Sequence, residues 1–238
     1  MASPLTFDDF KPVSLTSEVR FKNAYLLFDR TGQILDDLSE SFSEINTVMA
    51  TPQQSAFVCA EGTFNLELGA CRFASGQPNR DAKTFARNSK IFFDIVAGQL
   101  QIELFKRIGC RYVLRSEFKT EKESKEALAS MMLANLKPTK RFNSSESPTE
   151  VLFRWEDATI GATVRLKAET TEIKMNVPIE LQAHAPKVDK KIVGLTLDAD
   201  YYTVAPVERE QWDAEEWLQQ KIRIIDKEVD DIVRGGAR

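Results

Sequence analysis

The sequence has 238 residues, of which 42% are hydrophobic and 29% charged, and its 32 basic and 36 acidic side chains give a formal net charge of −4. This composition is typical of a folded globular chain and excludes a disordered one. The acidic excess argues against a dedicated non-specific nucleic-acid binder. We expect a cytoplasmic protein without a membrane span or signal peptide, because no apolar run of about 18 residues occurs and the first residues are acidic.

Candidate metal-binding and nucleophilic side chains are few. Three cysteines without CxxC spacing and a single histidine argue against a disulfide framework, a thiolate zinc site and a histidine-rich metal site. His184 lies in a polar stretch that predicts a surface loop, so we expect no catalytic histidine. No glycine-rich phosphate loop and no common hydrolase or kinase motif is present. We therefore expect no cofactor and favour a non-enzymatic role.

The first half of the chain predicts strands interleaved with helices. Apolar side chains at helical spacing, from Leu35 to Met49, predict an amphipathic helix over residues 31–49. Asp81 is a suitable N-cap for a long helix that continues to about residue 106. The predicted strands are 18–28, a hairpin of 55–60 and 63–73, and 107–118.

A helix over 120–136 follows, with a capping-box pattern from Thr120 to Glu123. Beyond residue 150, apolar and polar side chains alternate, which predicts antiparallel strands with one solvated face. The alternation covers 151–155, 164–168, 173–181 and 191–198, with Pro178 indicating an edge strand or bulge. A final helix over about 208–233 carries apolar residues at steps of three and four.

These elements predict an α+β fold in which antiparallel sheets are backed by amphipathic helices. Residues 137–149 contain two prolines, three serines and little apolar content, which is the composition of a linker. We therefore expect two subdomains in tandem, with residues 1–136 before the linker and residues 150–238, an antiparallel sheet plus the terminal helix, after it.

Three arginines on the predicted strand 107–118 form the main candidate binding site. Because strand side chains alternate, Arg107, Arg111 and Arg115 share one face, at multiples of about 6.8 Å. Guanidinium groups in such a row suit phosphates or the carboxylates of a partner protein. The alternative is that they pair with cross-strand acids of the same sheet, such as Glu67 or Glu156.

Two sets of carboxylates are candidate metal ligands. Asp157, Glu172 and Lys174 copy the D…ExK spacing of a metal-dependent nuclease, in which two carboxylates share a cation and the lysine lies near the phosphate. A solvated strand face explains the same residues. Asp198 and Asp200 would face one side of a strand end and could share a cation, or they could begin a turn.

The terminal helix is a candidate interface. Its apolar stripe either packs on the protein's own sheet or contacts another subunit, in which case a homodimer would also need the sheet, because two heptads are too few for a coiled coil. Two tryptophans at its start would be core residues or interface anchors. The candidate interface residues are Trp212, Trp217, Leu218, Ile222, Ile225 and Val229.

The segment Arg107-Ile108-Gly109-Cys110-Arg111-Tyr112 resembles the R-I-G-x-R-Y strand of a sporadically distributed family of uncharacterised bacterial proteins. That family has no established catalytic residues, so the resemblance assigns none here. The family's patchy distribution implies mobile genes, as for toxin–antitoxin, immunity and antiviral defence proteins.

Together these observations favour a non-catalytic protein that binds another protein, as an accessory, immunity or antitoxin-like component of a bacterial defence or toxin system. A metal-dependent nuclease or phosphodiesterase is the alternative from a different class. A nucleic-acid sensor that uses the arginine row is the third hypothesis.

Overall fold

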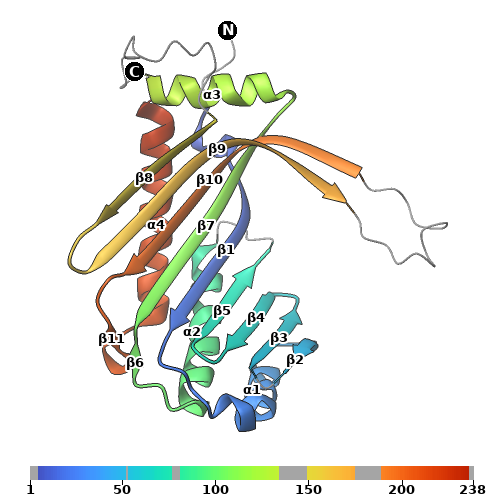
Figure 1. The fold of residues 1–238 in the computed structure, drawn as a ribbon, viewed down its shortest axis with the longest axis vertical. Coiled ribbons are helices and arrows are strands. Elements are labelled where there is room, and N and C mark those ends of the chain that lie inside the picture. Colours follow the sequence, from blue (N-terminus) through green and yellow to red (C-terminus); the bar gives the residue numbers. More distant parts are fainter. Residues whose placement is uncertain (1–4, 52, 77–80, 134–148, 175–188, 236–238) are drawn as a thin grey trace, which may run out of the picture.

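A nine-stranded antiparallel sheet forms the centre of the computed structural model, which describes residues 5–51, 53–76, 81–133, 149–174 and 189–235 (Figure 1). The strand order is β2-β3-β4-β5-β1-β7-β10-β9-β8. Among the described residues, no helix is both long and apolar enough to cross a membrane. The strands are β1 Lys11–Arg20, β2 Asn46–Ala50, β3 Gln54–Cys59, β4 Gly62–Glu67, β5 Ala70–Ser75, β7 Arg107–Phe118, β8 Glu150–Glu156, β9 Ile160–Lys174 and β10 Asp189–Thr203.

The helices cover one face of this sheet. In Figure 1, α2 and α4 lie behind the strands and α3 crosses their upper end. A second, two-stranded sheet pairs β6 with β11 below them. The remaining elements are the 3-10 turns η1 Phe7–Asp9 and η3 Arg209–Gln211, the helices α1 Leu27–Ser41, α2 Ala82–Gln99, α3 Glu121–Leu133 and α4 Ala214–Gly235, and the strands β6 Leu104–Phe105 and β11 Val207–Glu208.

The core lies between the sheet and the helices. Because side chains alternate along a strand, β7 turns Ile108, Cys110, Tyr112 and Leu114 toward the helices, where each is at most 1% exposed. The aromatic ring of Phe64 on β4 contacts that of Phe92 on α2, at 5.1 Å between centroids. The opposite face of the sheet stays uncovered by helices over the described residues, as the view in Figure 1 shows. The α+β class with a helix-backed antiparallel sheet is therefore confirmed.

The first predicted elements are displaced. The predicted strand 18–28 is instead the end of β1, a loop over residues 21–26 and the start of α1, and the predicted helix 31–49 ends at Ser41. The backbone at Phe42 is extended, and residues Asn46–Ala50 then form β2. The helical spacing of apolar residues continues past this boundary only by coincidence. Val48 and Met49 are exposed residues of the edge strand β2 and do not belong to a buried helical face.

The predicted hairpin is a three-stranded meander. Residues 63–73 are divided between β4 and β5 by a turn at Leu68-Gly69. The predicted N-cap of α2 is confirmed, since the Asp81 carboxylate accepts the backbone N–H groups of Lys83 and Thr84 at 3.1 and 3.3 Å. The helix ends at Gln99, before the predicted residue 106, and the chain leaves it through Gln101 with φ of 54°.

The C-terminal strands are longer than expected and belong to the same sheet as the N-terminal ones. The predicted strands 164–168 and 191–198 are parts of β9 and β10, and β10 pairs with β7 of the first half. Pro178 and His184 lie outside the described residues, as does nearly all of the predicted linker 137–149. The division into two subdomains at that linker stays a prediction, while the sheet itself is continuous across it.

Candidate binding face on the open side of the sheet

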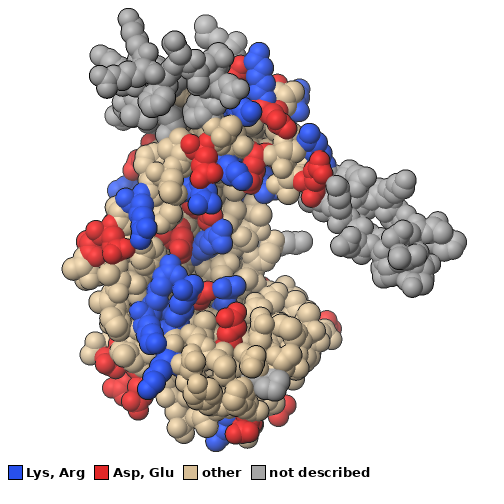
Figure 2. Space-filling view, in the orientation of Figure 1, with Lys and Arg blue, Asp and Glu red and all other residues tan. Residues whose placement is uncertain are grey.

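The uncovered side of the sheet carries the predicted arginine row. β7 turns Arg107, Arg111 and Arg115 to this side, with exposed side-chain fractions of 27, 57 and 17%. Figure 2 shows basic side chains gathered over the middle of the sheet, with acidic side chains between them. The alternation inferred from the sequence is thus confirmed, and the row is reachable from solvent at Arg111 and in part at Arg107.

Each arginine of the row is paired within the chain. Arg111 donates two hydrogen bonds to Asp198, Nε to Oδ1 and Nη2 to Oδ2, both at 2.7 Å. Arg115 donates to the Thr196 hydroxyl at 3.3 Å and lies 3.8 Å from Glu169. The cross-strand acids named from the sequence, Glu67 and Glu156, are not these partners, because the register brings β10 rather than β4 or β8 next to β7.

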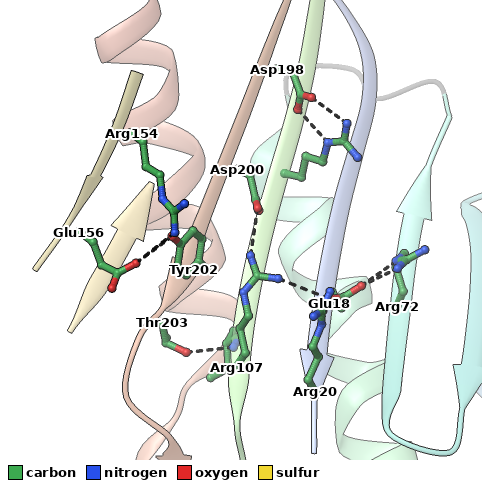
Figure 3. Close-up of polar contacts among 12 residues, drawn as sticks. Glu18, Arg20, Arg72, Arg107, Arg154, Glu156, Asp198, Asp200, Tyr202 and Thr203 are labelled. Atoms are coloured by element: carbon green, nitrogen blue, oxygen red, sulfur yellow. Dashed lines mark hydrogen bonds and ion pairs between the residues drawn. The ribbon is translucent and has the colours of Figure 1, made fainter. Parts of the chain in front are cut away.

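Glu18 on β1 connects three arginines. Its carboxylate accepts Nε of Arg20 at 2.6 Å and Nη2 of Arg72 at 2.5 Å, and it lies 3.8 Å from Arg107 (Figure 3). Burial raises the pKa of Glu18, but the hydrogen bonds from Arg72 and Arg20 outweigh it, and the pKa lies below its ordinary value. One largely buried carboxylate therefore holds together guanidiniums that would otherwise repel each other across β5, β1 and β7.

Tyr202 on β10 positions Arg107 from the other side. The guanidinium carbon of Arg107 lies 4.4 Å from the centroid of the Tyr202 ring, within cation–π distance, and its Nη2 is 3.0 Å from Asp200 (Figure 3). The Tyr202 hydroxyl donates to Glu156 at 3.1 Å. The ring lies over Gly161 on β9, where an added Cβ would come within 2.5 Å of ring carbons. Because residue 161 has no side chain, the Tyr202 ring has room to lie on the sheet at this position.

A groove of about 250 Å³ opens between these side chains. Gly109 lies in its lining, and a Cβ added there would meet its nearest atoms at 3.8 Å, which is ordinary van der Waals contact. Four guanidiniums and two carboxylates line the groove, and with the Asp198 carboxylate that binds Arg111 the excess is one positive charge. The lining residues are Thr16, Glu18, Arg20, Arg72, Arg107, Gly109, Arg111 and Asp200.

Asp198 and Asp200 face the same side of β10, as predicted, but they belong to the interior of the strand rather than to its end. Their carboxylates bind Arg111 and Arg107 instead of sharing a cation. Burial raises the pKa of Asp200 more than Arg107 lowers it, and its pKa lies above the ordinary value. No cluster of three acidic, histidine or cysteine side chains suited to a metal occurs among the described residues. Each of the two aspartates is therefore the ion-pair partner of an arginine on β7.

The predicted nuclease residues are not brought together. Asp157 lies in the turn between β8 and β9, where its carboxylate accepts the backbone N–H groups of Thr159 and Ile160. Glu172 is near the far end of β9, about 40 Å along a strand that rises by about 3.3 Å per residue. These two carboxylates cannot share one cation, which corrects that assignment. The side chain of Lys174 lies outside the described residues.

The predicted interface stripe of α4 is occupied by the protein's own core. Leu218, Ile222, Ile225 and Val229 are each at most 2% exposed because they face the helix side of the sheet and α2. Trp212 packs between the rings of Phe93 and Phe105, and Trp217 is partly buried against the same core. The four aliphatic residues offer no free surface to a partner, so the predicted subunit contact through this stripe is corrected to intramolecular packing, while the two tryptophans are partly buried against the core.

Three charged residues of the groove were missed from the sequence: Glu18, Arg20 and Arg72. The polar positions of β1 alternate as Thr16, Glu18 and Arg20, which was the signal for a charged strand face. The position of that strand next to β7 depends on tertiary pairing and could not be inferred from local pattern. No known protein-family model and no curated protein matches this chain.

Proposed function

We propose that this protein is a non-catalytic binding protein whose open sheet face receives another protein that presents exposed carboxylates. The observation that carries the proposal is the groove beside Gly109, in which four guanidiniums outnumber the carboxylates of Glu18, Asp198 and Asp200. Arg20, Arg72 and Arg111 remain 52, 45 and 57% exposed although each already has an acidic partner. Their unused N–H groups can donate to further carboxylate oxygens.

The composition of the groove favours a protein partner over nucleic acid. Single-stranded nucleic acid is usually bound by a positive surface together with aromatic rings on which bases stack. Among the described residues, no aromatic side chain lines the groove, and the nearby Tyr202 ring is in contact with Arg107 and lies over Gly161. The lack of stacking rings, rather than the charge of the groove, therefore favours a protein partner.

A narrower role follows from the resemblance of residues 107–112 to the sporadically distributed bacterial family. Under the proposal, the protein acts as an accessory, immunity or antitoxin-like component of a bacterial defence or toxin system, and its partner is a protein of that system. The described groove supports the binding step, and the resemblance alone supports the biological setting.

A titration with two labelled probes tests the proposal. We would measure binding of a glutamate-rich peptide and of a single-stranded oligonucleotide of equal net charge by fluorescence anisotropy. The peptide is expected to bind in a saturable manner that weakens with added salt. Arg111→Gln should weaken this binding, while the control Arg223→Gln, an exposed arginine on α4 of the helical layer, should leave it unchanged.

Two results would overturn the proposal. Peptide binding that is equally weakened by both substitutions would show non-specific charge attraction. Stronger binding of the oligonucleotide than of the peptide, lost in Arg111→Gln, would favour the nucleic-acid sensor instead.

A further inference from the structure

Strand β8 forms an exposed apolar edge away from the groove. Among the described residues, β8 is the terminal strand of the sheet. It pairs with β9 on one side, and no described strand lies on its other side. Leu152, Phe153 and Trp155 are 51, 42 and 43% exposed, although they lie in the middle of the strand. Leu152 is on the open face, and the other two are on the helix face at the margin of the core.

This edge lacks several features that usually prevent strand-to-strand association. Edge strands are commonly protected by bulges, prolines or charged side chains, lysine above all. β8 contains neither proline nor lysine, and it pairs with β9 over seven consecutive residues without a register shift. The opposite edge, β2, is shorter and carries a register shift between Thr47 and Met49. β8 is therefore the edge whose unpaired N–H and C=O groups are best arranged to accept another strand.

The charges of β8 specify which strand fits it. In an antiparallel pair, directly opposed residues point to the same face. If two copies of β8 pair about a two-fold axis at Leu152, each Glu150 lies opposite the partner's Arg154, and the two Leu152 side chains meet. On the helix face, Val151 lies opposite the partner's Phe153. This register thus places two opposite-charge pairs and three apolar pairs across the junction.

Neighbouring registers are electrostatically unfavourable. A two-fold axis at Phe153 would oppose Glu150 to the partner's Glu156, twice. An axis at Arg154 would place the two Arg154 side chains against each other. Like charges directly opposite destabilise a strand pair. Of these three registers, the sequence of β8 favours the one whose two-fold axis lies at Leu152.

We propose that two copies of this chain associate through β8, antiparallel about a two-fold axis at Leu152, so that their sheets join into one. Within a single chain, Glu150 lies 3.3 Å from Arg165 and Arg154 lies 3.8 Å from Glu156, both at the surface. Both side chains are more than 40% exposed and can reach a partner without leaving a buried charge behind. A contact of one strand is small, so the dimer is expected to form reversibly and in a concentration-dependent way.

Charge reversal tests the register. Sedimentation equilibrium of the full chain over a range of concentrations should show a monomer–dimer equilibrium. Glu150→Arg and Arg154→Glu, each alone, should weaken dimerisation by at least about tenfold, because each creates two like-charge pairs. An equimolar mixture of the two variants should recover the dimer, because positions 150 and 154 of the two different chains then carry opposite charges again. Arg87→Glu, a charge reversal at an exposed position of α2 away from β8, is the control and should dimerise normally.

Cysteine cross-linking provides a second measurement. Leu152→Cys should give a covalent dimer on mild oxidation, since opposed residues of an antiparallel pair lie within disulfide range. Phe153→Cys should cross-link more slowly, and the parent chain, with its half-buried Cys59, gives the background rate. A monomer at every concentration, failure of the mixed variants to associate, or faster cross-linking at position 153 than at 152 would each overturn the proposal.

Discussion

Arg111 on β7 lies directly opposite Asp200 of β10 in the strand register, yet both of its short hydrogen bonds go to Asp198, two residues away. Asp200 is thereby left to Arg107, whose Nη2 reaches it at 3.0 Å. Both guanidiniums therefore reach toward the Phe118 end of β7, and both line the groove at the centre of the open face.

The pair of Arg111 and Asp198 should contribute modestly to stability. Exposed ion pairs are worth at most about 1 kcal/mol, and bidentate geometry places this pair near the upper end of that range. A double-mutant cycle of Arg111→Ala and Asp198→Ala, measured by urea unfolding, should give a coupling energy of about 1 kcal/mol. The coupling should shrink in high salt. A coupling near zero at low salt would contradict the bidentate pairing.

Glu18 and Asp200 should change the acid sensitivity of the fold in opposite directions. Because the pKa of Glu18 is lowered in the folded state, its charge contributes stability that is present above the ordinary value of 4.5 and is lost as the pH falls through the folded pKa. Because the pKa of Asp200 is raised, the folded state takes up that proton first, and stability falls as the pH rises through the window from the ordinary 3.8 to the folded pKa.

Unfolding free energies measured from neutral to acidic pH test these opposite contributions of Glu18 and Asp200. Glu18→Gln should lose less stability on acidification than the parent chain, and Asp200→Asn should lose more. Parallel pH profiles for the two variants would show that the two carboxylates do not differ in environment as described.

Gly161 should tolerate a methyl group only when the Tyr202 ring is absent. Gly161→Ala is expected to cost about 1 kcal/mol, because the new Cβ displaces the ring from its place beside Arg107 and Glu156. In a Tyr202→Ala background the same substitution should be close to neutral. Equal costs in both backgrounds, measured by urea unfolding, would show that the ring does not lie over Gly161.

Ile225 tests whether the apolar stripe of α4 is core or interface. Since Ile225 is 1% exposed within one chain, Ile225→Ala should lower the free energy of unfolding by about 3 kcal/mol. The oligomeric state of the folded fraction should stay unchanged. Ile224→Ala, at a partly buried position beside it, should cost clearly less. A change in oligomeric state with little loss of stability would restore the interface interpretation.

The sequence predicted correctly those elements in which apolar and polar residues follow one regular spacing over the whole element. Strand 107–118 was correct because its apolar side chains alternate with the three arginines, and the burial alternates in the same way except at the buried Gly109. The turn at Leu68-Gly69 was missed although the apolar positions change from even numbers, Phe64 and Leu66, to odd numbers, Cys71 and Phe73. That change of parity is the signal of a turn in this segment.

The site depends on information that local pattern does not contain. Glu18, Arg107 and Asp200 lie far apart along the chain and meet only because β1, β7 and β10 are neighbours in the sheet. Whether an arginine is bound to an acid of its own chain is decided by that strand order and register. The sequence therefore predicted the arginine row, but not the carboxylates that hold it or the groove that they leave open.

Backbone amide mapping by NMR tests the central claim, that the open face of the sheet is the binding face. On titration with the glutamate-rich peptide, we expect the largest chemical-shift changes at Thr16, Gly109 and Arg111, which line the groove. Amides of α2 and α4, on the covered side, should change little. Shifts that cluster on these helices, with Gly109 unaffected at saturation, would contradict the account.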